Sequence, residues 1–325
     1  MDTLSTDLPW VEKYRPNGLE DLVAHQDIIE TIRNFIAKNA LPHMLLHGPP
    51  GTGKTSTVLA CAREMYGSNV RQMTLELNAS DDRGIDVVRD QIKNFVSSKN
   101  IFVQHMPKLV ILDEADNMTH AAQFALRRMI EQFASNARFC LICNYSSQII
   151  PALQSRCTKF RFGPLAPDQA RSRVAMIASN ENVNLTDDGM EALLRIGKGD
   201  MRRILNILQS VALSYSLIDS TNVHICTGVP LPSEMDAAFN SLLQDSFTSC
   251  LSLIDRLRVN NGYSLMEVVA EIHRRLAAIS LPVHVRCALH ADLADLEYRV
   301  AQGCSEKLQL TAMVGAFIEA RDRLK

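Results

Sequence analysis

The sequence predicts an α/β fold, in which helices flank a parallel sheet, followed by two regions that are entirely helical. Over residues 1–164, short apolar segments suited to buried strands alternate with helical patterns, the order expected of β–α–β units. A glycine-rich turn at residues 48–55 joins one such strand to the next helix. After Pro164 no further strong strand pattern occurs, and apolar residues recur at intervals of three and four.

The α/β part begins with a segment that we expect to be extended or turning, because residues 1–20 contain Pro9, Pro16 and Gly18. Apolar residues at helical spacing then predict a helix over 26–38. The remaining elements alternate: strands are expected at 43–47, 73–77, 109–113, 139–143 and 159–162, and helices at 54–65, 86–98 and 120–133.

The helical part divides into two domains, which we place at residues 165–228 and 229–325. The first should contain amphipathic helices at 167–179, 187–196 and 201–215, and Thr186 and Asp200 are suited to cap the last two. The glycine and prolines of residues 228–232 mark a linker, and the pattern beyond them is again helical.

Composition limits the possible functions. The net charge of −2 gives no general attraction to nucleic acid, so any DNA contact would need a local basic patch. The eight cysteines are scattered, mostly among apolar residues, which is typical of a reducing compartment. Cys140 and Cys143 have the CxxC spacing of a zinc site, but a buried strand is the favoured interpretation because no second pair follows. No apolar run approaches the roughly 18 residues of a membrane span, and residues 1–5 lack the apolar core of a signal peptide.

The segment Gly48-Pro49-Pro50-Gly51-Thr52-Gly53-Lys54-Thr55 fits the phosphate-binding P-loop pattern. An apolar strand, a glycine turn and a helix N-terminus together form an anion site, because unpaired backbone N–H groups and the helix dipole face the ligand. Lys54 is expected to reach the β- and γ-phosphates of ATP, and the Thr55 hydroxyl to bind Mg²⁺. A chance glycine loop is disfavoured because the motif and its context agree.

A second motif runs from Leu109 to Asp116, where four apolar residues are followed by acidic ones. Asp113 at the strand end would hold Mg²⁺, directly or through water, and Glu114 would orient and deprotonate the attacking water. A plain strand followed by an acidic turn is the alternative. The P-loop upstream favours the catalytic interpretation.

Several segments spread over nearly the whole chain carry a family resemblance: residues 10–16, 48–55, 77–84, 112–116, 125–128, 155–157 and 199–203. In them the chain resembles the AAA+ ATPases and, within these, the small subunits of replication factor C, the sliding-clamp loader. Among these subunits it resembles the type numbered three in yeast and five in animals. The resemblance implies an AAA+ core, a helical lid and a helical collar that joins subunits into a ring.

The same resemblance implies ATP and Mg²⁺ as cofactors, with ATP driving the loading of the sliding clamp PCNA onto primed DNA. It also implies other replication factor C subunits, PCNA and primer-template DNA as partners, with no membrane, and a nuclear location. Another AAA+ machine, such as a branch-migration motor or a helicase loader, and a nucleotide-binding scaffold without turnover are the alternatives. The clamp-loader segments oppose the first, and the complete set of motif residues opposes the second.

The resemblance assigns further roles at the nucleotide. Asn144 matches sensor 1 and Arg202 sensor 2, although Asn144 could be a strand-ending turn residue and Arg203 could take the place of Arg202. Arg156 matches the arginine finger that acts on a neighbouring subunit, against the alternative of an ordinary surface arginine. The full nucleotide-binding set is Val11, Arg15, Val23, Gly48, Pro49, Pro50, Gly51, Thr52, Gly53, Lys54, Thr55, Ser56, Asn144 and Arg202.

Two expectations concern DNA. Asn78 ends the strand 73–77, and in the resembled family the equivalent residue can hold the catalytic glutamate inactive until DNA binds. The helix 86–98 carries Arg89 and Lys93 on one face and follows Arg83, so these three side chains are candidates for phosphate contacts. A solvated basic helix face is the alternative, and it is the family resemblance that favours DNA.

Overall fold

The computed structural model describes residues 8–22, 24–79, 85–97 and 106–324. Backbone contacts divide the chain into two compact units. The first consists of Met1–Asn184 with Leu193–Gln209, and the second of Leu185–Ala192 with Ser210–Lys325.

The first unit is built on a five-stranded parallel sheet with the order β2-β3-β4-β1-β5, which confirms the predicted fold class. Each strand is a short apolar segment, as expected for strands that are covered on both faces. The strands are β1 (Met44–His47), β2 (Thr74–Asn78), β3 (Lys108–Asp113), β4 (Ala137–Cys143) and β5 (Thr158–Arg161).

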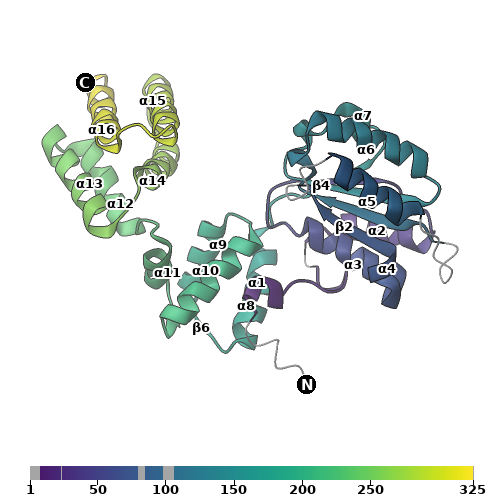
Figure 1. Cartoon of the computed structure of the whole chain (residues 1–325). Coiled ribbons are helices and arrows are strands. Elements are labelled where there is room, and N and C mark those ends of the chain that lie inside the picture. The colour runs from purple at the N-terminus through teal and green to yellow at the C-terminus, as the bar shows by residue number, and fades with distance from the viewer. Residues whose placement is uncertain (1–7, 23, 80–84, 98–105, 325) are drawn as a thin grey trace. The chain divides into compact units, whose positions relative to one another are not determined.

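Helices cover both faces of this sheet (Figure 1). Leu46, Ile111 and Ile142 point to the face that packs on α2 (Gln26–Ala37) and α3 (Lys54–Tyr66), beside the short α4 (Val70–Met73). Alternate strand residues, such as Leu45, point to the other face. There they pack under α5 (Ile85–Ser97), α6 (His120–Phe133) and the short α7 (Pro151–Gln154). Cys140 and Cys143 are buried in β4, as a strand interpretation requires.

The strand order decides what surrounds the P-loop. Since β1 lies between β4 and β5, the chain that leaves β1 passes between the ends of both neighbours. The Gly48 amide donates to the Cys143 carbonyl at 3.3 Å, and the Phe162 amide donates to the His47 carbonyl at 2.8 Å. Asn78, Asp113 and Asn144 end or follow neighbouring strands at the same edge of the sheet.

The first unit also contains helical segments beyond the sheet. These are α8 (Pro167–Asn180), the end of α9 (Asp187–Gly197) and the larger part of α10 (Met201–Ser214). The Asp200 carboxylate caps α10, because it accepts from the backbone amides of Arg202 and Arg203 at 2.9 and 3.2 Å. One turn that the sequence does not predict, α1 (Trp10–Lys13), lies in the segment expected to be extended.

The second unit is almost entirely helical. Its elements are α11 (Ser220–Thr227), α12 (Pro232–Gln244), α13 (Phe247–Asn261), α14 (Leu265–Ala278), α15 (Val283–Ala301) and α16 (Glu306–Asp322). The last five enclose one apolar core that includes Leu242, Ile272, Leu293 and Phe317. Ser264 and Glu267 form a capping box that fixes the start of α14.

The part of the chain after Pro164 holds a detail that the sequence does not predict. Two strands of two residues each, β6 (Asn184–Leu185) and β7 (Leu217–Ile218), form a small sheet. Thr186 supports it by donating both its amide and its hydroxyl to the Ile218 carbonyl, at 3.1 and 2.9 Å. Two residues are too short for a period-two pattern to be recognised.

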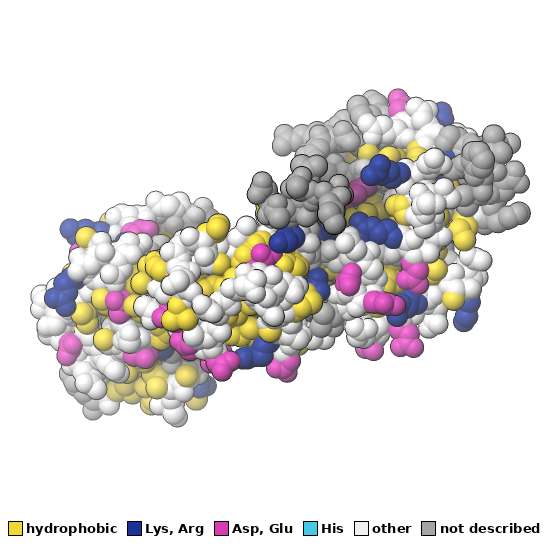
Figure 2. Space-filling model, turned by 90° about the horizontal axis from the view of Figure 1, so that it is seen from below, with side chains coloured by type: hydrophobic (Ala, Val, Ile, Leu, Met, Phe, Trp, Pro, Cys, Tyr) yellow, Lys and Arg dark blue, Asp and Glu magenta, His cyan; other side chains and the backbone are white. Residues whose placement is uncertain are grey.

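The surface agrees with the low net charge. Among the described residues on the face seen in Figure 2, Lys and Arg side chains are interspersed with Asp and Glu. None of the helices in the described ranges combines the length and the apolar character that crossing a bilayer requires.

Candidate functional site

The P-loop owes its shape to glycines in conformations that other residues rarely adopt. Gly48, Gly51 and Gly53 have φ values of 148°, 67° and 91°. The turn ends where α3 begins at Lys54, so the first amides of that helix face the loop. The sequence motif therefore has the strand, turn and helix context that an anion site needs.

Gly48 is also required by its surroundings. A Cβ atom built at this position would lie 1.9 Å from the carbonyl oxygen of Phe162. That segment cannot easily withdraw, since the Phe162 amide is bonded to His47 at 2.8 Å. The sequence motif requires glycine so that the backbone can approach the phosphate. The structure gives a second reason, which is the close approach of the Phe162 carbonyl just after β5.

We expect Gly48→Ala to weaken nucleotide binding at least about tenfold and to lower the free energy of unfolding by roughly 1–3 kcal/mol, from strained backbone and displaced β5. Titration with a fluorescent ATP analogue and urea denaturation measure the two effects. Gly67→Ala is the matched control, because Gly67 also has positive φ, at 54°, but a Cβ there would meet nothing within 4 Å. Equal losses in both variants would show that Phe162 plays no part.

Lys54 is held at the centre of the strand edge. Its Nζ donates to the carbonyls of Gly48 and Pro49, both at 2.7 Å, and to Oδ1 of Asn144 at 3.1 Å. Only 7% of the residue is exposed. Burial lowers the pKa of Lys54, and the charge of Asp113 opposes that effect. The loop carbonyls thus accept from the ammonium of Lys54 at the position where phosphate oxygens would accept from it.

Thr55 and Asp113 form the second part of the site. The Thr55 hydroxyl donates to Oδ2 of Asp113 at 2.7 Å, and the other Asp113 oxygen accepts from the Glu114 amide at 2.9 Å. A hydroxyl and a carboxylate in contact are the oxygen donors that Mg²⁺ prefers, so the residues fit this ion.

Glu114 and Asn78 lie on adjacent strand ends. Glu114 has a left-handed φ of 52°, and its Oε2 accepts from Nδ2 of Asn117 at 3.1 Å. Asn78 pairs in register with Asp113, and the Ala79 amide donates to the Asp113 carbonyl at 3.0 Å. The parallel ladder therefore brings Asn78 to within one residue of Glu114 in register.

Asp116 is a residue whose part in the site the sequence analysis missed. Its Oδ2 accepts from the backbone amides of Asn144 and Tyr145, at 2.9 and 3.1 Å. It thereby ties the turn after β3 to the end of β4 and fixes the backbone that carries the Asn144 amide. Asp116 is the last residue of the acidic motif that begins at Leu109, but a local pattern does not reveal a partner 28 residues away.

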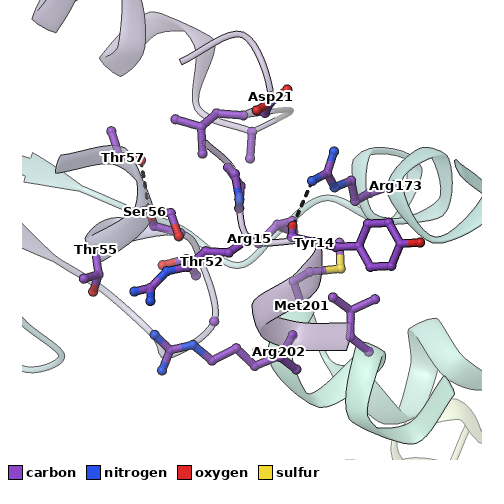
Figure 3. A pocket seen from close by; sticks show the side chains of 18 of the residues that line it. Tyr14, Arg15, Asp21, Thr52, Thr55, Ser56, Thr57, Arg173, Met201 and Arg202 are labelled. Carbon is purple, nitrogen blue, oxygen red and sulfur yellow. Dashed lines mark hydrogen bonds between the residues drawn. The ribbon is translucent and has the colours of Figure 1, made fainter. Parts of the chain in front are cut away.

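A pocket within the first unit opens beside the P-loop (Figure 3). Arg15 and Arg202 extend toward Thr52 and Thr55, whereas the ring of Tyr14 is turned the other way. Of the residues predicted to bind nucleotide, the lining includes Val11, Arg15, Gly51, Thr52, Gly53, Thr55, Ser56 and Arg202. Lys54, Asp113 and Asn144 join this pocket through the hydrogen bonds that surround Thr55 and the loop.

Asp200 connects α10 directly to the P-loop. The Met201 amide donates to the Gly51 carbonyl at 3.2 Å, and a Cβ on Gly51 would lie 1.7 Å from Oδ1 of Asp200. The sequence predicts Asp200 as a helix cap but not this contact. The cap thus also sets where Arg202 enters the pocket.

Arg156 follows α7 and is not among the described residues that line the pocket. Its Nη1 donates to the Ala152 carbonyl at 2.7 Å, and its Nη2 pairs with Glu131 at 2.5 Å. Arg127 pairs with the same carboxylate at 3.6 Å. The side chain is partly exposed, as a group that acts on another molecule must be.

The remaining predicted residues are only partly described. Val23 and Arg83 lie outside the described residues, and so does the side chain of Arg89. Lys93 is exposed on α5. Of the three residues predicted to contact DNA, the structure therefore describes the side chain of Lys93.

Two family models match the chain. The model of the ATPase family associated with various cellular activities (AAA) matches residues 44–165. The model of the replication factor C C-terminal domain matches residues 230–316.

Several proteins are similar over nearly their whole length. The chain is 51% identical to replication factor C subunit 5 of Mus musculus and of Homo sapiens, in each case over 316 residues that cover 97% of this chain and 93% of the relative. It is 49% identical to replication factor C subunit 3 of Schizosaccharomyces pombe over 309 residues, which cover 95% of this chain and 90% of that protein.

A solved structure shares the fold at much lower identity. The Holliday junction branch migration motor RuvB of Thermotoga maritima matches with a TM-score of 0.53 and 16% identity, over 83% of this chain and 93% of that one. This likeness bears on the fold alone.

Proposed function

The chain belongs to the replication factor C family of AAA ATPases, and from this membership we propose that it works as a clamp-loader subunit whose ATP hydrolysis drives the loading of the sliding clamp PCNA onto primed DNA. The observation that carries the proposal is the bonded arrangement at the strand edge. Lys54 contacts Asn144, Thr55 contacts Asp113, and Glu114 follows directly.

We propose that ATP lies with its phosphates on the P-loop and its base toward Val11, Arg15 and Val23. Thr55 and Asp113 would hold Mg²⁺, which would offset the negative charge of the phosphates. Glu114 would orient the attacking water and accept its proton. Asn144 would hold that water or the γ-phosphate, and Arg202 would reach the phosphates from the start of α10.

The site remains incomplete within one chain under this proposal. Arg156 lies outside the pocket of its own chain, which supports a role at the site of a neighbouring subunit. The partners would be other replication factor C subunits arranged in a ring. The two family-model ranges end at 165 and begin at 230, which supports a core over 1–164, a lid over 165–228 and a subunit-joining collar over 229–325.

DNA contact is proposed for Arg83, Arg89 and Lys93, with the chain tracking phosphates rather than reading bases. Asn78 would hold Glu114 inactive until DNA enters, a role supported by its place on the strand beside Asp113. Since primed DNA is replicated in the nucleus of eukaryotes, and the similar proteins named above are eukaryotic replication factor C subunits, we propose a nuclear location.

The test is the ATPase activity of the assembly that co-purifies with this chain. We expect turnover to rise when the sliding clamp and primed DNA are present together, and to rise less with either alone. The same measurement with a four-way DNA junction and no clamp is the control. Stimulation by the junction instead of by clamp and primed DNA would indicate a branch-migration motor.

A further inference from the structure

The segment that forms α1 is bonded to the lid helices of the first unit. The Trp10 amide donates to Oε1 of Gln209 at 3.0 Å, and Nη2 of Arg173 donates to the Tyr14 carbonyl at 3.0 Å. Lys13 Nζ and the Tyr14 hydroxyl both donate to Oε1 of Glu181, at 2.6 and 2.5 Å. Residues 10–14 are thus held at four points by α8, its C-cap and α10.

The bonding partners of the chain change within three residues after Tyr14. Asp21 Oδ2 accepts from the amides of Asn17 and Gly18, each at 3.1 Å, and Nη1 of Arg63 on α3 donates to the Asn17 carbonyl at 2.9 Å. Residues from 17 onward therefore belong to the sheet-bearing core. The change of bonding partners falls at Arg15 and Pro16, and the fixed φ of proline makes this connection stiff.

Two of the four bonds that hold residues 10–14 end on Glu181. Glu181 is the C-cap residue of α8, where its backbone amide donates to the Ile177 carbonyl at 3.0 Å, and its side chain is only 17% exposed. Burial would by itself raise the pKa of Glu181, but the hydrogen bonds from Lys13 and Tyr14 outweigh burial and lower that pKa. Burial, with help from Glu181, raises the pKa of Tyr14 to about 12, so the phenol stays a donor.

The attached segment forms one wall of the pocket beside the P-loop. Val11, Glu12 and Tyr14 of this segment line it together with the P-loop residues Gly51, Thr52 and Gly53. Figure 3 shows Arg15, which follows the segment directly, extending toward Thr52.

We propose that Glu181 is a positioning residue for the nucleotide: through Lys13 and Tyr14 it holds residues 10–14 against α8 and α10, and so fixes the wall of the pocket to which Val11 and Tyr14 contribute. This inference rests on the nucleotide site proposed above. It predicts that loss of Glu181 weakens the grip on the base while the grip on the phosphates is kept.

The test compares two ligands on the full chain. The Kd for ATP is measured by displacement of a fluorescent ATP analogue, and the Kd for inorganic tripolyphosphate in the same way. Glu181→Ala should raise the Kd for ATP roughly 3- to 10-fold, as expected when two charge-assisted bonds are lost, and change the Kd for tripolyphosphate less than about twofold. The Kd for ATP of Glu181→Gln should lie between those of the parent chain and of Glu181→Ala, because the amide oxygen of glutamine still accepts hydrogen bonds.

Asp168→Asn is the control, since it removes a carboxylate from an exposed position on α8 and should change neither Kd. Tyr14→Phe tests the path: the double variant with Glu181→Ala should bind ATP no more weakly than Glu181→Ala alone, because both changes break the same bond. Unchanged ATP affinity, equal weakening of both ligands, or additive effects of the two changes would each overturn the inference.

A further variant separates this inference from the proposed site. Lys54→Ala should weaken ATP and tripolyphosphate alike. If it weakens neither, the assignment of the P-loop pocket fails, whatever Glu181 does. If it weakens both while Glu181→Ala leaves the two affinities unchanged, only the role of Glu181 fails.

Discussion

Replacing Glu114 with glutamine is expected to lower ATP turnover at this subunit's site by about 10²–10⁴-fold, the usual worth of a positioned general base. The amide is nearly isosteric, and its oxygen can still accept from Asn117, which now bonds to Glu114 at 3.1 Å. What is lost is the capacity to take a proton from water. The Kd for ATP should stay within about twofold, because Lys54 and Thr55 are unchanged. The group proposed to be lost acts on the water and not on bound ATP.

The measurement is single-turnover hydrolysis in the co-purified assembly, combined with ATP titration of the variant chain. Glu64→Gln is the control, because Glu64 lies exposed on α3, the helix that follows the P-loop, and carries the same charge. A Glu114→Gln assembly that retained the parent rate at this site would refute the assignment of the base. Weaker ATP binding with an unchanged rate would point instead to a ligand-holding role.

Arg156→Ala should leave ATP binding to its own chain intact and slow hydrolysis at the neighbouring subunit's site by about 10³-fold or more, the worth of an arginine finger. The reason is geometric: Arg156 lies outside the pocket of its own chain and pairs with Glu131. Stability should change by less than about 1 kcal/mol, since the ion pair is partly exposed and such pairs contribute little.

Two assemblies distinguish action on the neighbour from action within the chain. One carries Lys54→Ala, which should abolish ATP binding to this chain and leave Arg156 in place. The other carries Arg156→Ala, which should leave ATP binding to this chain intact and slow hydrolysis at the neighbouring subunit's site. Lys159→Ala is the control, as Lys159 is an exposed cation on the nearby β5 that bonds only to the Gln154 side chain among the contacts described. Loss of ATP binding by the Arg156→Ala chain itself would contradict a role in trans.

The local patterns of the sequence predicted most of the first unit. The P-loop spacing located Lys54 and Thr55, and four apolar residues before Asp113 located the strand that carries it. These predictions succeed because the geometry they describe is local: a strand, a turn and a helix start are neighbours in the chain. The paired strands β6 and β7 were not predicted, because each is too short to show a period.

The contacts that assemble the site join residues that are far apart in the sequence. Asp116 holds the backbone of Asn144 from 28 residues away, and Glu181 holds Tyr14 from 167 residues away. Glu181 is, by its sequence surroundings, an ordinary acidic residue beside a helix end, and nothing in a window of ten or fifteen residues distinguishes it from the exposed Asp168. Asp116 ends the acidic motif that begins at Leu109, but the motif does not reveal its partner.

By itself, then, the sequence determined the order of the elements, the phosphate-binding turn and the acidic strand end, since hydrophobic periodicity and glycine placement act over a few residues. The tertiary structure alone decided that Gly48 faces the Phe162 carbonyl, that Asp200 meets Gly51, and that residues 10–14 are bonded to α10 and to the C-cap of α8. These facts follow from which strands lie side by side and where helices pack. Packing depends on the whole buried surface of the unit and leaves no signature in any single segment.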